Sequence, residues 1–432
     1  MVSRIISGIK RRLSDPFWKN VATLTSGSVI AQALPVLVFP ILTRVYSKEA
    51  IGFYFVFVGI GLITQIIASL QYELAILLPK DKKDSNTIFE LSLIIVLVNT
   101  LIMQGLILLL DDWLYSLIKQ EGFAQFIHLI PLSTFLLGMF RVLNNYMNLE
   151  RKYKHIAYSK IAKSVTLGII QVGMGLLGFL TSGMVIGLLA GQAVSVIYLV
   201  IQLIYRTEFK FQWDWTSMIR LAKVYKDMPI FNTAISFLSN LSNQLPVFFL
   251  SRYFGAAASG DYGLANRVVS TPMELVGSSV GQVFFQESAH LVKTKGDLHQ
   301  LVKDTYKRLF KIAIIPFLLL LISAPWLFSW FFSDEYITSG YLTQILIPWL
   351  FLNFLNSPVS YLFDVLNKQR FMTIFHTVYF LSRIAGLLAG FYIFQNVFIA
   401  VAIFSTIGIL FNGYTIYYYL KISKSTDFQI YK

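Results

Sequence analysis

The chain has 432 residues, of which 56% are hydrophobic and only 13% are charged, and it contains no cysteine. Soluble domains carry about 25% charged residues, so this composition excludes an ordinary soluble protein. Without cysteine the chain has no disulfides, thiolate metal sites or cysteine nucleophiles. The net charge of +14 is compatible with nucleic-acid binding. In a chain this apolar, however, basic cytoplasmic loops are the first explanation. We therefore expect no nucleic-acid partner, no metal and no cofactor.

Residues 1–20 form a basic lead. Ile5, Ile6, Ile9 and Leu13 share one helical face, and most of the cations of this segment lie off that face. This pattern predicts a short cytoplasmic helix lying in the membrane interface. The lead has no apolar run long enough for a signal peptide.

The remainder is a series of apolar spans that predicts an all-α, polytopic integral membrane protein. The seventh and eighth spans are the most polar, and a strict hydropathy threshold would miss them. The twelve predicted transmembrane helices cover residues 21–43, 51–72, 88–110, 123–147, 155–180, 183–204, 229–251, 257–285, 307–331, 340–363, 371–394 and 397–420.

Cations gather in alternate connections between these spans. One set holds the clusters Lys80–Lys83, Arg151–Lys154 and Arg206–Lys226, whereas the other holds few cations and includes Asp111 and Asp334. The positive-inside rule then places both termini in the cytoplasm. No connection is long enough for a soluble domain. The chain also lacks a G-x-x-x-x-G-K-[ST] loop, so we expect a secondary-type transporter without ATPase activity and not an enzyme.

A short motif occurs twice at an offset of 208 residues. Leu42, Arg44, Gly52 and Tyr54 correspond to Leu250, Arg252, Gly260 and Tyr262. Two halves of six spans share one orientation, related by an axis along the membrane normal. The sequence thus predicts two six-helix lobes with a central cavity. The expected parts are an N-terminal lobe at 21–204, a cytoplasmic inter-lobe linker at 205–228, a C-terminal lobe at 229–420 and a cytoplasmic tail at 421–432.

The eighth span carries a polar stripe at helical spacing, formed by Arg267, Thr271, Glu274, Ser278 and Gln282. A charge at the centre of a membrane helix costs about 2.5–3.5 kcal/mol, so these groups are expected to face protein or a water-filled cavity. Two interpretations remain open. Arg267 and Glu274 form an internal structural pair, or the stripe lines a cavity for an anionic substrate.

Neutral polar groups follow the equivalent first and second spans of both halves. Any single stripe of Ser, Asn or Gln is more often used for hydrogen bonds between helices. Their recurrence in equivalent helices favours a cavity lining. The candidate neutral residues are Asn232, Asn243, Gln65 and Gln282.

Four further cations lie within predicted spans: Arg141, Lys160, Lys163 and Arg383. The first three have an alternative interpretation, because their side chains can extend to the cytoplasmic interface. Arg383 lies about 18 Å from the inner edge of its span, which favours a cavity-facing role over pairing with Glu274 or Asp364. Since buried cations outnumber buried carboxylates, a phosphate or diphosphate group is the expected ligand. Glu274 and Asp364 are candidate coupling carboxylates.

Local motifs add a family resemblance. They are residues 44–54 with their counterpart at 252–262, Gln71-Tyr72-Glu73 closing the second span, and 284–289 closing the eighth. The chain resembles the Wzx-type polysaccharide flippases of the MOP superfamily, which transport O-antigen or capsule repeat units.

The resemblance implies movement of undecaprenyl-pyrophosphate-linked oligosaccharide from the cytoplasmic to the periplasmic leaflet of a bacterial inner membrane by alternating access. It also implies contacts with membrane lipids and polysaccharide-assembly proteins. Cavities in this family are cationic. The positions in this chain that fit are Arg267, Arg383, Lys160, Lys163 and Arg141.

Two alternatives are weaker. A cation-coupled multidrug antiporter of the same superfamily is expected to place carboxylates in its cavity, and the first span has none. A membrane glycosyltransferase or polymerase is expected to have a large extracytoplasmic loop, and no predicted outer loop exceeds about fifteen residues. The sequence therefore favours a flippase.

Overall fold

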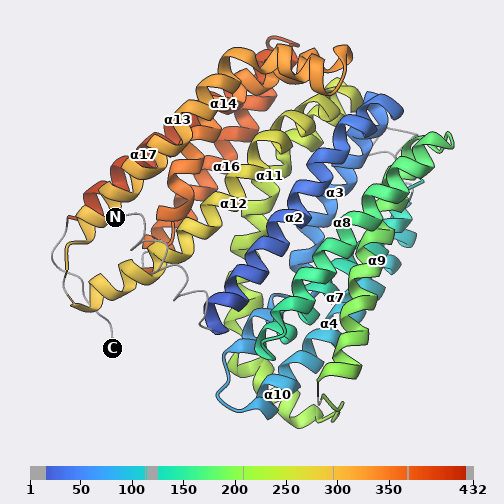
Figure 1. Cartoon of the computed structure of the whole chain (residues 1–432), viewed down its shortest axis with the longest axis vertical. Helices are drawn as coiled ribbons and strands as arrows, with labels where there is room; N and C mark the ends of the chain where they lie inside the picture. Colours follow the sequence, from blue (N-terminus) through green and yellow to red (C-terminus); the bar gives the residue numbers. More distant parts are fainter. Residues whose placement is uncertain are drawn as a thin grey trace. The chain divides into compact units, whose positions relative to one another are not determined.

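The computed structural model describes residues 16–111, 113, 125–207, 209–294, 296–366 and 369–424, and these are almost entirely helical (Figure 1). Nine helices among these residues are long and apolar enough to cross a membrane. The prediction of an all-α, polytopic membrane protein is confirmed. The exact count of twelve transmembrane helices stays a prediction. The basic lead lies largely outside the described residues, as does most of the expected tail.

Every predicted span coincides with a helix. The first six correspond to α2 (Pro16–Val45), α3 (Lys48–Ala68), α4 (Lys82–Leu109), α7 (Ile130–Leu149), α8 (Tyr153–Leu176) and α9 (Leu180–Arg206). The others correspond to α11 (Thr233–Phe254), α12 (Ala256–Thr294), α13 (Leu298–Phe331), α14 (Ile337–Val359), α16 (Gln369–Tyr392) and α17 (Val397–Ile422). Shorter elements are η1 (Tyr72–Leu77), η2 (Ile127–Leu129), α10 (Trp215–Val224), η3 (Met228–Asn232), η4 (Asp334–Tyr336) and α15 (Leu362–Val365).

Of the twelve helices that correspond to predicted spans, α8, α11 and α12 are not among the nine apolar ones. The sequence predicts that a strict threshold would miss two of them, α11 and α12, because of their polar stripes. The third, α8, carries Lys154, Lys160 and Lys163. These three helices carry several of the candidate site residues, including Arg267, Lys160 and Lys163.

The chain divides into two compact units, residues 1–241 and 242–432. In the N-terminal unit α8 packs against α2 and α9, and α7 packs against α9, α3 and α4. In the C-terminal unit α14 packs against α12, α13 and α17, and α17 packs against α16. The division falls inside α11, and the predicted lobe and linker boundaries stay a prediction.

The expected linker contains the short helix α10, which packs against α4. Met218 and Leu221 are its buried residues, and Arg220 forms an ion pair with Asp84 at 2.7 Å. The Asp214 side chain caps the helix by accepting from the Ser217 amide and hydroxyl. The hydrogen bond from the Ser217 side chain is the main cause that holds the pKa of Asp214 below its ordinary value. This amphipathic segment is thus fastened to the N-terminal unit.

Helix ends follow local sequence. Ser47 caps α3 by accepting from the Ala50 amide at 3.3 Å, and Asn396 caps α17 by accepting from the Phe398 amide at 2.8 Å. Gly178 and Gly255 lie between α8 and α9 and between α11 and α12, with φ of 83° and 93°. Only glycine adopts this left-handed conformation without strain, so both glycines permit a tight reversal of the chain.

The duplicated motif has the same burial pattern in both units. Leu42 is 1% exposed and Leu250 0%, while Tyr54 is 2% exposed and Tyr262 0%. The arginines at the two equivalent positions, Arg44 and Arg252, are exposed. Each motif joins the end of one long helix to the start of the next, which supports an internal duplication.

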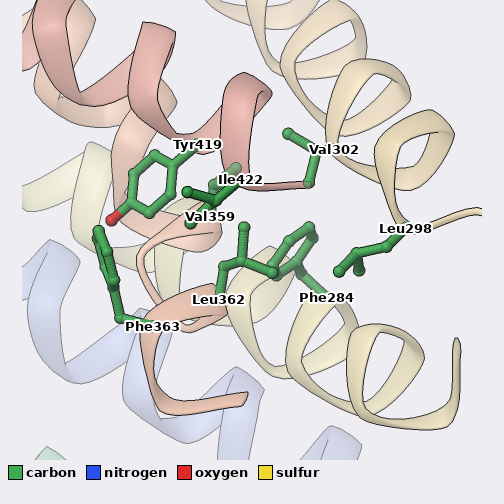
Figure 2. Packing of buried hydrophobic residues seen from close by; sticks show 8 residues of the cluster. All are labelled: Phe284, Leu298, Val302, Val359, Leu362, Phe363, Tyr419 and Ile422. Atoms are coloured by element: carbon green, nitrogen blue, oxygen red, sulfur yellow. The ribbon is translucent and has the colours of Figure 1, made fainter. Parts of the chain in front are cut away.

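One hydrophobic cluster joins α12 to the last helices of the C-terminal unit (Figure 2). Its members are Phe284 of α12, Leu298 and Val302 of α13, Val359 of α14, Leu362 and Phe363 of α15, and Tyr419 and Ile422 of α17. These contacts position α12, whose polar stripe is the principal candidate feature of the sequence.

Close approach of α16 and α17 depends on small residues. A methyl group added at Gly390 would lie 2.6 Å from Cβ of Ala400. We expect Gly390→Ala to lower the free energy of unfolding by about 1–3 kcal/mol, because well-packed interiors tolerate added volume poorly. Thermal unfolding of the purified protein in detergent measures the effect.

Gly413→Ala is the matched control in α17. No heavy atom lies within 4 Å of a methyl group added at Gly413, so this replacement is expected to be neutral or slightly stabilising. Equal unfolding temperatures for the two variants would contradict tight packing at Gly390.

Candidate functional site

The N-terminal unit carries two half-buried lysines on α8. Lys160 Nζ donates a hydrogen bond to Ser28 Oγ of α2 at 3.1 Å. Lys163 Nζ lies 6.0 Å from the ring centroid of Phe140 on α7, at the outer limit of a cation–π contact. The ion pairs of the described residues do not include Lys160. Its partner is a neutral hydroxyl, so its positive charge remains able to attract an anion.

Arg141 of α7 is held differently. Its Nη2 lies 2.6 Å from Oε1 of Glu73, a carboxylate that is fully buried in η1. The Ser69 hydroxyl donates to the other oxygen of the same carboxylate. The structure thus brings together two residues that the sequence analysis did not pair. Glu73 therefore has two partners inside the N-terminal unit, which indicates a structural role. The apolar sequence around Glu73 gave no sign of this pairing.

The polar stripe of α12 lies away from the face that the helix buries. Ala265, Val269 and Met273 are buried, and α12 packs against α14. In contrast, Arg267 is half-buried and Glu274 is exposed. The two charges interact electrostatically along the same helix.

Both open interpretations of the α12 stripe are compatible with this placement. The guanidinium of Arg267 is close enough to Glu274 for the charges to act on one another, and the Arg267 side chain is only half-buried. Thr271 is half-buried and Ser278 is exposed. The Gln282 side chain lies outside the described part of the structure.

Arg383 of α16 is fully enclosed in the C-terminal unit. The guanidinium carbon lies 4.1 Å from the ring centroids of Tyr379 and Phe404 and 4.3 Å from that of Trp349. These rings come from α16, α17 and α14. Several cation–π contacts, each worth about 2 kcal/mol when desolvated, offset part of the cost of burying the charge. A cavity-facing role for Arg383 stays a prediction, because its exposed fraction here is 0%.

The neutral candidates make local contacts. Asn232 Nδ2 donates to Met228 Sδ at 3.2 Å in η3, and Gln65 Nε2 donates to the Leu62 carbonyl at 3.3 Å. Asn243 of α11 is exposed. The Asp364 side chain lies outside the described residues. No group of His, Asp and Glu within the described ranges could hold a metal ion.

Together these features define a multi-pass helical membrane protein whose two units carry cations inside long helices. The chain belongs to a family of polysaccharide biosynthesis proteins, whose family model matches residues 41–340. This membership, with the fold, confirms the expected resemblance to the polysaccharide flippases of the MOP superfamily.

Solved structures of transporters and of a lipid flippase share the fold at low sequence identity. The lipid II flippase MurJ, in an inward closed conformation, aligns with a TM-score of 0.71 and 14% identity over 93% of this chain and 90% of that one. An inward-facing multidrug resistance MATE transporter aligns with a TM-score of 0.63 and 15% identity, over 91% of this chain and 96% of that one. A transporter from Pyrococcus furiosus, noted for the reverse polarity of its binding pocket, aligns with a TM-score of 0.63 and 14% identity. The alignment covers 96% of this chain and 97% of that one. No curated protein matches the sequence.

Proposed function

We propose that the protein is a flippase that moves an undecaprenyl-diphosphate-linked oligosaccharide from the cytoplasmic to the periplasmic leaflet of a bacterial inner membrane. One observation carries this proposal, namely membership of a polysaccharide biosynthesis family in a chain with the fold of a lipid II flippase. The positive-inside rule supports cytoplasmic termini, and alternating access is the transport cycle that we infer.

The chemistry of the substrate assigns different roles to the five cations. A diphosphate requires donors that it can reach, and guanidinium groups bind phosphate oxygens in a bidentate manner. In the C-terminal unit Arg267 is half-buried on α12, so part of its side chain lies at the surface. In the N-terminal unit Lys160 and Lys163 are candidates of the same kind. Arg141 is paired with Glu73 and Arg383 is enclosed by rings, so both are weaker candidates for direct contact.

Glu274 is the carboxylate that we propose to couple transport to protons, because it interacts with Arg267. Protonation would remove its attraction for that guanidinium and leave Arg267 available to an anion. Asp364 stays a prediction for the same role. Membrane lipids and polysaccharide-assembly proteins are the partners that this function would require.

Purified full-length protein in proteoliposomes tests the function. A fluorescent polyprenyl-diphosphate oligosaccharide is incorporated, and an added glycosidase cleaves only the molecules that reach the outer leaflet. We expect the protein to increase the cleaved fraction above that of protein-free liposomes.

Two other results would favour the alternatives. Uptake of an organic cation without movement of the oligosaccharide would indicate a multidrug antiporter. A longer oligosaccharide, detected by mass spectrometry, would indicate a glycosyltransferase or polymerase. Either result without movement of the lipid-linked sugar contradicts the flippase.

A further inference from the structure

The cluster around Arg383 has hydrogen-bonding groups that its aromatic neighbours cannot satisfy. A guanidinium group donates its N–H groups in its own plane, and it cannot accept a hydrogen bond. Arg383 Nε and Nη2 are buried and have no hydrogen-bond partner among the described residues. The rings of Tyr379, Phe404 and Trp349 interact with the positive charge, but they offer no strong acceptor to these N–H groups. Buried donors without acceptors are rare and destabilising.

A second unpaired group belongs to the same interior. Tyr262 of α12 is fully buried, and its hydroxyl has no hydrogen-bond partner in the part of the chain that the structure describes. Tyr262 and Arg383 interact electrostatically, which places the two side chains in one neighbourhood of the C-terminal unit. Two helices, α12 and α16, thus direct donors into a region that is lined by aromatic rings.

No carboxylate of the described ranges forms an ion pair with Arg383. Asp261, the residue next to Tyr262, accepts a hydrogen bond from Ser339 Oγ at 2.7 Å. That carboxylate is therefore engaged with α14. The charge of Arg383 and the donors beside it would both be satisfied by one acceptor that carries a negative charge.

We propose that the C-terminal unit binds a small inorganic anion such as chloride, held by the N–H groups of Arg383 and the hydroxyl of Tyr262. A monovalent ion matches the single positive charge, and a dry, ring-lined site disfavours phosphate or sulfate because a divalent anion costs more to dehydrate. The site goes beyond the proposed flippase function. Arg383 is 0% exposed, so the headgroup of a lipid cannot contact it in this conformation.

Thermal unfolding in detergent tests the site with full-length protein. Chloride is replaced by gluconate at constant ionic strength, because a ligand that binds only the folded state raises the unfolding temperature. We expect saturating chloride to raise the unfolding temperature of the wild-type protein by about 3 °C. Tyr262→Phe removes only the hydroxyl and is expected to lose most of this rise.

Tyr54→Phe is the matched control, because Tyr54 is the buried equivalent of Tyr262 in the N-terminal unit. It should keep the full response to chloride. Equal unfolding temperatures of the wild type in chloride and gluconate would overturn the proposal, as would an unchanged response in Tyr262→Phe.

Crystals of the wild-type protein grown in bromide give a second measurement. It needs no variant, so it does not depend on whether Tyr262→Phe folds. An anomalous peak within hydrogen-bonding distance of Arg383 Nε or Nη2 supports the site, and its absence there contradicts it. Neither measurement uses transport. A negative result for the anion site therefore leaves the proposed flippase function untouched, and a negative transport assay leaves the anion site untouched.

Discussion

Replacing Arg267 by alanine is expected to lower the initial rate of oligosaccharide transport about 10- to 100-fold while the protein still folds. Hydrogen bonds to charged groups contribute about 1.5–3 kcal/mol, and each 1.4 kcal/mol corresponds to a factor of ten. Arg267 is half-buried and is not one of the fully buried residues through which α12 packs, so we expect the variant to fold. The proteoliposome assay measures the rate, and thermal unfolding verifies the fold.

Two further variants separate a specific contact from a general effect of charge. Arg267→Lys keeps the charge but loses bidentate geometry, so it should recover only part of the rate. Lys421→Ala removes an exposed cation in the last turn of α17 and should transport at the wild-type rate. A wild-type rate in Arg267→Ala would remove this residue from the substrate site.

The helices of this protein were predictable because crossing a bilayer requires long apolar runs, and such runs stand out in the sequence. The side on which a polar stripe lies was equally predictable for α12, since helical spacing alone puts Arg267 and Glu274 together. Depth along a helix could also be inferred. Arg383 was expected far from the membrane interface; the structure shows that it is fully buried within the protein, and its depth in the membrane stays a prediction.

Partners from distant helices could not be inferred. Arg383 is surrounded by rings from α14 and α17 as well as its own helix, and no local pattern selects Trp349 or Phe404. The pairing of Arg141 with Glu73 likewise joins α7 to η1. Such contacts depend on how helices are arranged, which hydropathy does not determine.

The end of α3 is a second place where a contact from another helix could not be predicted from the sequence. The sequence predicts a span to residue 72. The helix instead ends at Ala68, where Asn99 Nδ2 donates to the carbonyls of Ile67 and Ala68 at 2.9 and 3.2 Å. A side chain from α4 thus satisfies the free carbonyls of the helix terminus. The chain then turns through a left-handed conformation at Gln71, with φ of 62°, and presents Glu73 to Arg141.

Arg141→Ala is expected to lower the free energy of unfolding by about 3–5 kcal/mol, because it leaves the fully buried carboxylate of Glu73 without its cation. Chemical unfolding of the purified protein in detergent measures the loss. Combining Arg141→Gln with Glu73→Gln removes both charges and should restore most of the stability, since neutral amides can hydrogen-bond to one another and to Ser69.

An ion pair with one exposed partner is the control for this experiment. Lys82 Nζ lies 2.7 Å from Glu150 Oε1, and the Lys82 side chain is 57% exposed, so Lys82→Ala should cost less than about 1 kcal/mol. Stable but transport-deficient Arg141→Ala protein would instead make Arg141 a substrate contact, as the sequence first suggested. Loss of stability in Arg141→Ala, with transport retained by the stable double variant, would establish that Arg141 serves the fold of the N-terminal unit and not the diphosphate.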